Sequence, residues 1–205
     1  MPSIYGLKSR FLGLLRPLAR TLARAGVTAN EVTLFAGALS IGFGLLLTTR
    51  ISSRPMLLLT PAILFVRMAL NATDGVLARE FGQKSALGAY LNELGVVVSD
   101  AFLYLPFAYL PGFDPVWIGA SIVLAVICEM TGTVAAMTGA SRRYDGPMGK
   151  SDRALVFGAL ALWLGLGFGL ATSASYWFPR LMALALSVTI MNRVRNGLAE
   201  MDAVH

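Results

Sequence analysis

Apolar residues fill this chain in long blocks that short polar stretches separate. The first block follows Thr28-Ala29-Asn30-Glu31, where a threonine precedes a glutamate by three residues, as in the capping box that begins helices. Ser151 or Asp152 is expected to cap the fifth block in the same way. The blocks predict helices over about residues 29–47, 55–79, 85–110, 116–139, 153–171 and 176–194. Because such lengths of apolar helix suit a bilayer, the expected fold class is an all-α membrane protein with six transmembrane helices.

The first 25 residues show a different pattern. Over residues 3–25, large apolar side chains recur at helical spacing beside a basic stripe in steps of four. The apolar positions are Phe11, Leu15, Leu18 and Leu22, and the basic ones are Arg16, Arg20 and Arg24. This pattern predicts an interfacial amphipathic helix at the headgroup level, with a solvated basic helix as the alternative. It does not fit a signal peptide, because arginines interrupt the apolar stretch.

Composition agrees with a membrane protein. Of the 205 residues, 56% are hydrophobic and only 14% are charged, against about 25% charged in an ordinary soluble domain. We therefore expect an integral, multi-pass protein of a bacterial inner membrane. Its expected divisions are an amphipathic juxtamembrane helix at 1–26, a six-helix transmembrane domain at 27–198 and a short tail at 199–205.

The net charge of +6 arises from basic residues that flank the apolar blocks. That placement indicates anionic lipid headgroups, and no nucleic acid, as the partner. If six helices cross the membrane, one side receives most of the basic residues and the other receives Arg50, Arg54 and Arg180. The positive-inside rule then predicts that both termini and the polar stretch described next are cytoplasmic. Cys128 and His205 are the only cysteine and histidine, so neither a disulfide nor histidine catalysis is expected.

Polar residues gather between residues 71 and 100, in the sequence NATDGVLAREFGQKSALGAYLNELGVVVSD. In a helix, Asn71, Asp74 and Ala78 share one face. A second face repeats in steps of four and consists of Gly88, Asn92, Val96 and Asp100. Two helices that present these faces to each other would close a small polar pocket.

This stretch resembles the signature of the CDP-alcohol phosphotransferase family, which reads D-x2-D-G-x2-A-R-x8-G-x3-D-x3-D. The spacing is intact, and five positions match: Asp74, Gly75, Ala78, Arg79 and Gly88. Three aspartate positions depart from the signature and hold Asn71, Asn92 and Val96. The resemblance implies a transferase of phospholipid biosynthesis that moves a phosphatidyl group from CDP-diacylglycerol to a small alcohol acceptor, with release of CMP.

The resemblance also implies roles for particular residues. Members of the family hold two divalent cations on four aspartates, and the last aspartate is the expected general base. Mg²⁺ or Mn²⁺ is the expected cofactor, since both prefer oxygen ligands. The implied metal ligands here are Asp74, Asn71 and Asn92, and Val96 occupies the position of the base, with Glu93 and Asp100 as substitutes. The implied nucleotide- or substrate-binding residues are Gly75, Ala78, Arg79, Gly88, Lys150 and Arg153. Dimers are common in the family, which leaves a homodimer open.

The replaced aspartate positions leave more than one interpretation of the function. The chain is also similar to a branch of the family with an N-x2-D-G, N-E-L-G-D and G-P-x-G-K-S-D-R pattern, in which only Val96 is out of place. Val96 is then either natural drift in a catalytically inactive homologue that binds nucleotide, lipid or a partner, or an engineered replacement. A small transporter is disfavoured, because the polar residues gather at one end of two helices.

Two further charges fall inside apolar blocks. Charged residues within membrane helices are costly and are usually functional or paired. Arg67 and Glu129 therefore either support the pocket or form a structural ion pair. For Lys150 and Arg153 a place in the pocket competes with a purely topological role, whereas Arg142 and Arg143 are expected to act mostly in topology.

Overall fold

The computed structural model describes residues 4–203, with side chains described from residue 11, and that range contains helices and no strand. The elements in chain order are α1 (Ile4–Arg24), α2 (Ala29–Thr49), α3 (Arg54–Glu80), α4 (Ala86–Tyr104), the 3-10 helix η1 (Leu105–Tyr109), α5 (Pro115–Met137), α6 (Lys150–Gly165) and α7 (Thr172–Asp202). The all-α class and the order of the helices are as the sequence predicts. His205 lies outside the described residues.

Four of the described helical segments are long and apolar enough to cross a membrane. They are α2, α3, α4 together with η1, and α5. Helix α6 has 16 residues, fewer than the roughly 20 that span a bilayer core. The prediction of six spans and that of an interfacial role for α1 thus remain predictions.

The helix ends follow from local side chains, with one correction. The capping box at the start of α2 is confirmed: Glu31 N donates to Thr28 Oγ1 over 3.2 Å, and Thr28 N donates to the Glu31 carboxylate over 2.7 Å. The expectation that Ser151 or Asp152 caps α6 is wrong. Gly149 is the N-cap, and its N–H donates to the Asp152 carboxylate over 2.9 Å. Because that carboxylate reaches back over one turn, α6 starts before residue 153.

The helix predicted over 85–110 changes its winding before it ends. After Tyr104 the chain continues as the 3-10 helix η1, which contains Pro106. Proline has no N–H to donate to the preceding turn, and its ring crowds the carbonyl four residues earlier. The α-helical hydrogen bonding therefore stops near this residue.

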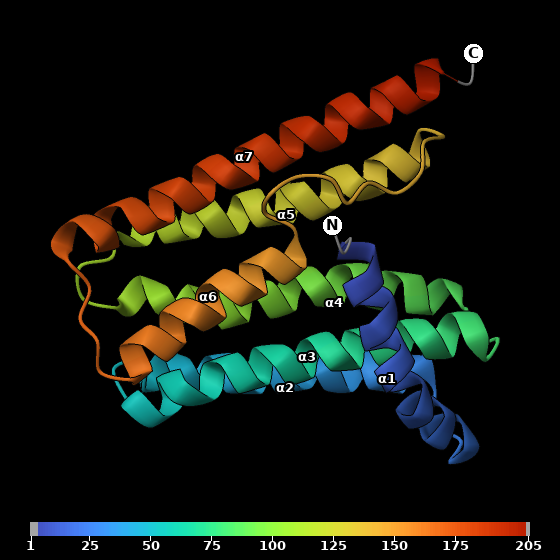
Figure 1. Ribbon diagram of the computed structural model, residues 1–205, viewed down its shortest axis with the longest axis horizontal. Coiled ribbons are helices and arrows are strands. Elements are labelled where there is room, and N and C mark those ends of the chain that lie inside the picture. Colours follow the sequence, from blue (N-terminus) through green and yellow to red (C-terminus); the bar gives the residue numbers. More distant parts are fainter. Residues whose placement is uncertain (1–3, 204–205) are drawn as a thin grey trace.

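The helices pack mainly in pairs, and α2 and α3 each pack against more than one other helix. Helix α2 packs against both α3 and α4, α6 lies along α3, and α5 pairs with α7, while α1 crosses α3 (Figure 1). The main apolar core lies among α2, α3, α4, α6 and the start of α5 and includes Phe107, where the Tyr104 and Phe157 rings stack 4.2 Å apart. One end of the bundle gathers the end of α1, the α3–α4 connection, the end of α5 and the end of α7.

The connection between α5 and α6 does not stay at that end. It turns back along the bundle, so that α6 begins well inside it (Figure 1). Gly146 has a φ of +107°, which favours glycine, and a Cβ there would lie 2.6 Å from Thr189 on α7. Met148 N also donates to Thr189 Oγ1 over 3.0 Å. The close packing of this loop against α7 brings its polar residues into the bundle.

Gly44 sets the closest approach of α2 to α4, and its replacement is expected to destabilise the bundle. A Cβ at Gly44 would lie 2.2 Å from the carbonyl oxygen of Phe102, which is backbone. Gly44→Ala should therefore lower the free energy of unfolding by about 1–3 kcal/mol, as other overpacking changes do. Gly42→Ala in the same helix is the control, because a Cβ there has no neighbour within 4 Å. Unfolding of both variants in detergent, followed by circular dichroism, tests this; equal stabilities would contradict it.

Candidate functional site

Asp74 is the only aspartate of the α3 half of the motif, and it is held in place. Its side chain is buried, and Thr33 Oγ1 on α2 donates to Asp74 Oδ2 over 2.7 Å. A Cβ at Gly75 would lie 2.9 Å from the guanidinium of Arg79, which folds back over this glycine. Ala78 packs against an apolar cluster shared by α2 and α3. The α3 half of the motif thus presents a fixed carboxylate beside a guanidinium.

The α4 half of the motif starts at a capped helix end. Ser85 Oγ accepts from Gly88 N over 2.9 Å, and a Cβ at Gly88 would lie 2.7 Å from Asn30 Oδ1 on α2. The missing side chain at Gly88 thus allows α2 to approach α4 closely. Farther along the same face, Asn92 is half-buried and Val96 is buried. An aliphatic side chain therefore occupies the interior position at which the family signature has its last aspartate.

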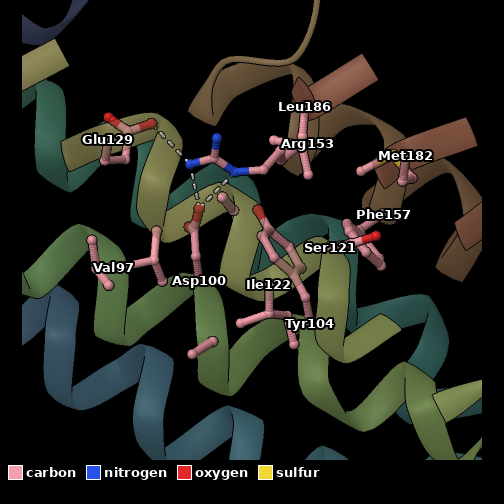
Figure 2. Close-up of a pocket in the computed structure, with 13 residues that line it drawn as sticks. Val97, Asp100, Tyr104, Ser121, Ile122, Glu129, Arg153, Phe157, Met182 and Leu186 are labelled. Atoms are coloured by element: carbon pink, nitrogen blue, oxygen red, sulfur yellow. Dashed lines mark hydrogen bonds and ion pairs between the residues drawn. The ribbon is translucent and has the colours of Figure 1, made fainter. Parts of the chain in front are cut away.

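Asp100, one turn beyond Val96, lies between two arginines. Arg67 Nη2 on α3 is 2.5 Å from Asp100 Oδ1, and Arg153 on α6 donates from Nε and Nη2 to Asp100 Oδ2 over 2.9 and 2.7 Å. Arg153 Nη2 also donates to Glu129 Oε1 on α5 over 3.0 Å (Figure 2). All four side chains are at most 5% exposed. Structural Arg–Asp and Arg–Glu pairs, one of the two roles considered for Arg67 and Glu129, are therefore present: Arg67 pairs with Asp100, and Glu129 pairs with Arg153.

The ion pairs continue outward from Glu129. Arg142, in the loop after α5, pairs with Glu93, and its Nη2 lies 3.6 Å from Glu129 Oε2. Arg193 Nη1 on α7 lies 3.8 Å from Glu129 Oε2 and donates to the Cys128 carbonyl oxygen over 2.5 Å. The topological role expected for Arg142 stays a prediction, and the folded-back loop also carries this arginine to the buried Glu129 and the partly exposed Glu93. The connected network holds four guanidinium groups and three carboxylates, so it has one positive charge in excess.

Lys150 lies at the start of α6, near the motif. Helix α6 runs antiparallel along α3, with Gly165 against Leu58 and Gly158 against Leu64. Continued at 1.5 Å per residue, this register brings the start of α6 toward the motif end of α3. The Lys150 charge interacts with Glu129 and, more weakly, with Asp74. The structure thus brings Lys150 to the motif, whereas Arg153 faces Asp100 and Glu129.

These features can be compared with known proteins. The sequence model for CDP-alcohol phosphatidyltransferases matches residues 26–191. The chain belongs to the CDP-alcohol phosphatidyltransferase family. Enzymes of this family transfer phosphatidyl groups and depend on a metal.

Two curated relatives of the family match nearly the whole chain. The inner membrane protein YnbA of Escherichia coli strain K12 is 44% identical over 200 residues, which are 96% of each protein. Phosphatidylinositol phosphate synthase of Mycobacteroides abscessus is 28% identical over 214 residues, which cover 96% of this chain and 91% of the synthase. The similarity thus extends over nearly the full length of both relatives.

Solved structures show the same fold. Phosphatidylinositol phosphate synthase PgsA1 of Mycobacterium tuberculosis with CDP-DAG bound aligns with a TM-score of 0.73 at 21% identity, covering 89% of this chain and 92% of the synthase. The same synthase in complex with manganese and citrate aligns with a TM-score of 0.73 at 21% identity, covering 90% of this chain and 88% of the synthase. Because the sequence identity is only 21%, these two comparisons show a shared fold and no more.

The donor set of the motif fits the family's metal in part. Hard divalent cations prefer oxygen ligands, and Asn71, Asp74 and Asn92 offer one carboxylate and two amide carbonyls. Val96 offers no ligand atom. Within residues 4–203, no group of three or more aspartate, glutamate, histidine or cysteine side chains is arranged to hold a metal. The residues present suit one cation that keeps water or substrate ligands.

A cavity beside the ion pairs is too small for a substrate. Its volume is about 10 Å³, and Asp100, Glu129 and Arg153 line it together with Tyr104 and Phe157 (Figure 2). A water molecule needs roughly this much space. The buried end of the network is therefore closed packing with no room for a substrate.

Sequence reasoning missed several contributors to this region. Thr33 was not considered, although a threonine in an apolar helix facing the motif would have been a detectable signal. Arg193 is one of the basic residues that the sequence predicts at the cytoplasmic side, and nothing in its sequence context marks it as part of the site. Its place near Glu129 depends on how α7 packs against α5, which the residue pattern within one helix does not specify.

Proposed function

We propose that this protein is an integral transferase of the bacterial inner membrane that moves a phosphatidyl group from CDP-diacylglycerol to the hydroxyl group of a small alcohol. The observation that carries the proposal is the fixed carboxylate of Asp74, held by Thr33 beside Arg79 in a motif of the right spacing. Family membership supports the reaction class. The CDP-DAG in the related synthase structure supports the donor.

The reaction requires one bond to form and one to break. The acceptor oxygen attacks the phosphorus that bears the diacylglycerol, the bond from that phosphorus to the CMP oxygen breaks, and CMP leaves with the electron pair. Asp74, Asn71 and Asn92 would hold the divalent cation, which neutralises charge on the pyrophosphate when bound. Arg79 is positioned to pair with a phosphate oxygen. Gly75 leaves room for the Arg79 guanidinium to fold over α3, and Gly88 lets α2 approach α4 closely.

The acceptor proton needs a base, and we propose Glu93 as a substitute that is less effective than an aspartate at position 96 would be. Asp100 accepts hydrogen bonds and ion pairs from two arginines, so its oxygens hold the bundle together. The Glu93 side chain is 29% exposed, and its charged partner is Arg142. Glu93 is also adjacent to Asn92, at the open part of the motif. These contacts leave Glu93 better placed than Asp100 to take up a proton.

The excess positive charge favours an anionic acceptor. Lys150, Arg142 and Arg193 lie where the α5–α6 loop enters the bundle, and the network around them has more guanidinium groups than carboxylates. A phosphate on the acceptor alcohol would balance that excess through charge-assisted hydrogen bonds. We therefore propose a phosphorylated small alcohol as the acceptor.

One observation favours a second function. Val96 is 6% exposed and cannot accept a proton, while Glu93 and Asp100 are both engaged in ion pairs. On this evidence the alternative is a catalytically inactive family member that binds nucleotide, lipid or a partner protein. It would bind CDP-diacylglycerol without releasing CMP.

We further propose six membrane spans over residues 27–198, with α1 at the headgroup level. The termini and the motif would then be cytoplasmic. Support comes from the arrangement in Figure 1, in which the end of α1, the α3–α4 connection and the end of α7 lie at one end of the bundle. The inner membrane name of the relative from Escherichia coli supports the location. A homodimer is compatible with this arrangement.

The deciding experiment measures CMP release from CDP-diacylglycerol by the purified chain in liposomes with Mn²⁺ or Mg²⁺. A panel of small alcohols and their phosphate esters is supplied as acceptors. CMP release that needs both an acceptor and the metal, and that stops on chelation, is the expected result. Binding of CDP-diacylglycerol without CMP release for any acceptor would instead support the inactive family member.

The hydrogen bond from Thr33 leads to a separate prediction. Thr33→Val keeps the shape of the side chain but removes the donor to Asp74 Oδ2. Loss of a partner that orients a metal ligand typically weakens metal affinity by about 10- to 100-fold. We expect a loss of that size in Mn²⁺ affinity, measured by electron paramagnetic resonance. Thr131→Val on α5, where the hydroxyl bonds only to the Ile127 carbonyl, should leave the affinity unchanged; a similar loss in both variants would contradict the assignment.

A further inference from the structure

The motif site of this chain carries little negative charge. Asp74 is its one signature carboxylate, whereas Asn71 and Asn92 contribute neutral amides and Val96 contributes none. Each divalent cation brings two positive charges into a largely buried region. Uncompensated charge in such surroundings is expensive, so the number of cations the site can hold follows from the number of carboxylates.

The other carboxylates nearby are already neutralised. Asp100 is held by Arg67 and Arg153, and Glu93 is paired with Arg142. The network that contains them has an excess of positive charge, not of negative charge. Recruiting these carboxylates to a second cation would leave buried guanidinium groups without partners, which is strongly unfavourable.

Lys150 adds a positive charge of the protein's own. The antiparallel packing of α6 on α3 brings the start of α6 toward the motif, and the Lys150 and Asp74 charges interact. Glu129, the other carboxylate near Lys150, is already surrounded by the guanidinium groups of Arg153, Arg142 and Arg193. The lysine is thus free to act toward an anion at the Asp74 site.

We infer that the motif site holds a single divalent cation on Asp74, and that the Lys150 ammonium supplies the charge for which a second cation would otherwise be needed. Asp74 and Lys150 cancel each other, so one divalent cation and the Arg79 guanidinium bring three positive charges to a pyrophosphate diester that carries one negative charge on each of its two phosphoryl groups. A second cation would raise the excess from one positive charge to three. Cations such as Mg²⁺ are commonly bound through one or two carboxylates together with substrate phosphates. The inference rests on the proposed function, because it concerns the same nucleotide site.

The first test counts bound cations and needs no turnover. The full chain in lipid nanodiscs is titrated with Mn²⁺, with and without CDP, and the loss of the free Mn²⁺ paramagnetic resonance signal gives the number bound. One Mn²⁺ per chain is the expected result. Two Mn²⁺ per chain would overturn the inference while leaving the proposed function intact. No bound Mn²⁺ in either condition would overturn both.

Variants then test the role of each group. Lys150→Met should weaken CDP binding by about tenfold or more, as removal of one member of a buried charge pair does, whereas Lys84→Met at an exposed position should not change it. Equal CDP affinities of Lys150→Met and the parent would overturn the role of Lys150. The triple variant Asn71→Asp, Asn92→Asp and Val96→Asp should bind a second Mn²⁺. If the folded triple variant still binds one Mn²⁺ per chain, the missing carboxylates do not determine how many cations the site holds, and the inference is overturned.

Discussion

Replacing Val96 with aspartate is expected to raise the rate of CMP release by about 10²- to 10⁴-fold, the usual contribution of a positioned general base. Val96 is buried on the α4 face that also holds Asn92 and Asp100. Arg67 Nη2 lies 3.5 Å from the Val96 carbonyl oxygen, so a positive charge is near the new carboxylate. That charge favours the ionised, proton-accepting form of an aspartate.

Val96→Asn is the matched control for this prediction. It has nearly the volume and polarity of aspartate but cannot take up a proton, so its rate should stay near that of the parent chain. Both variants and the parent are assayed for CMP release from CDP-diacylglycerol in the same liposomes with Mn²⁺. An equal rise in both variants would show that polarity at position 96, and not a base, limits the rate. A parent as fast as Val96→Asp would support Glu93 as the base.

Asp100→Asn is expected to lower the free energy of unfolding by about 3–5 kcal/mol, the typical effect of removing one partner from a buried ion pair. Asp100 is the carboxylate that joins Arg67 to Arg153, and the three side chains are at most 5% exposed. An amide in its place leaves two buried guanidinium groups facing a neutral group. Unfolding of the purified protein in detergent, followed by circular dichroism, measures the change.

The matched control for this second prediction is Glu80→Gln. It removes a carboxylate from the Arg16–Glu80 pair, in which the side chains are 56% and 41% exposed. Exposed pairs of this kind contribute about 0–1 kcal/mol, so this variant should stay close to the parent. If Asp100→Asn unfolds like the parent but no longer releases CMP, Asp100 acts in the chemistry and its structural role is wrong.

The parts of the fold that depend on local sequence could be predicted. The capping box of Thr28 and Glu31 marks the start of α2, and the apolar blocks give the order of the helices, because both features act between residues close in the chain. The start of α6 was predicted too late, at residue 153. Asp152 favours a helix start equally well as N-cap or as third residue of a capping box, and the Gly149 contact decides between them.

The partners of the buried charges could not be predicted in the same way. Spacing predicted that Val96 and Asp100 share one helix face, and both are buried, because a helical repeat depends only on neighbouring residues. Arg153 and Asp100, by contrast, are far apart in sequence and meet only because α6 starts inside the bundle. That start depends on the contact of Gly146 with Thr189, which belongs to the tertiary structure.

The position of Arg67 in α3 has a consequence for biosynthesis. Because its buried partner Asp100 lies in the next helix, a nascent chain that has added only α1 to α3 exposes an unpaired guanidinium within an apolar segment. A central arginine opposes insertion of an isolated segment by roughly 2.5–3.5 kcal/mol on translocon scales. Helices α3 and α4 are therefore expected to leave the translocon together as a hairpin, with the ion pair already formed when the pair enters the lipid.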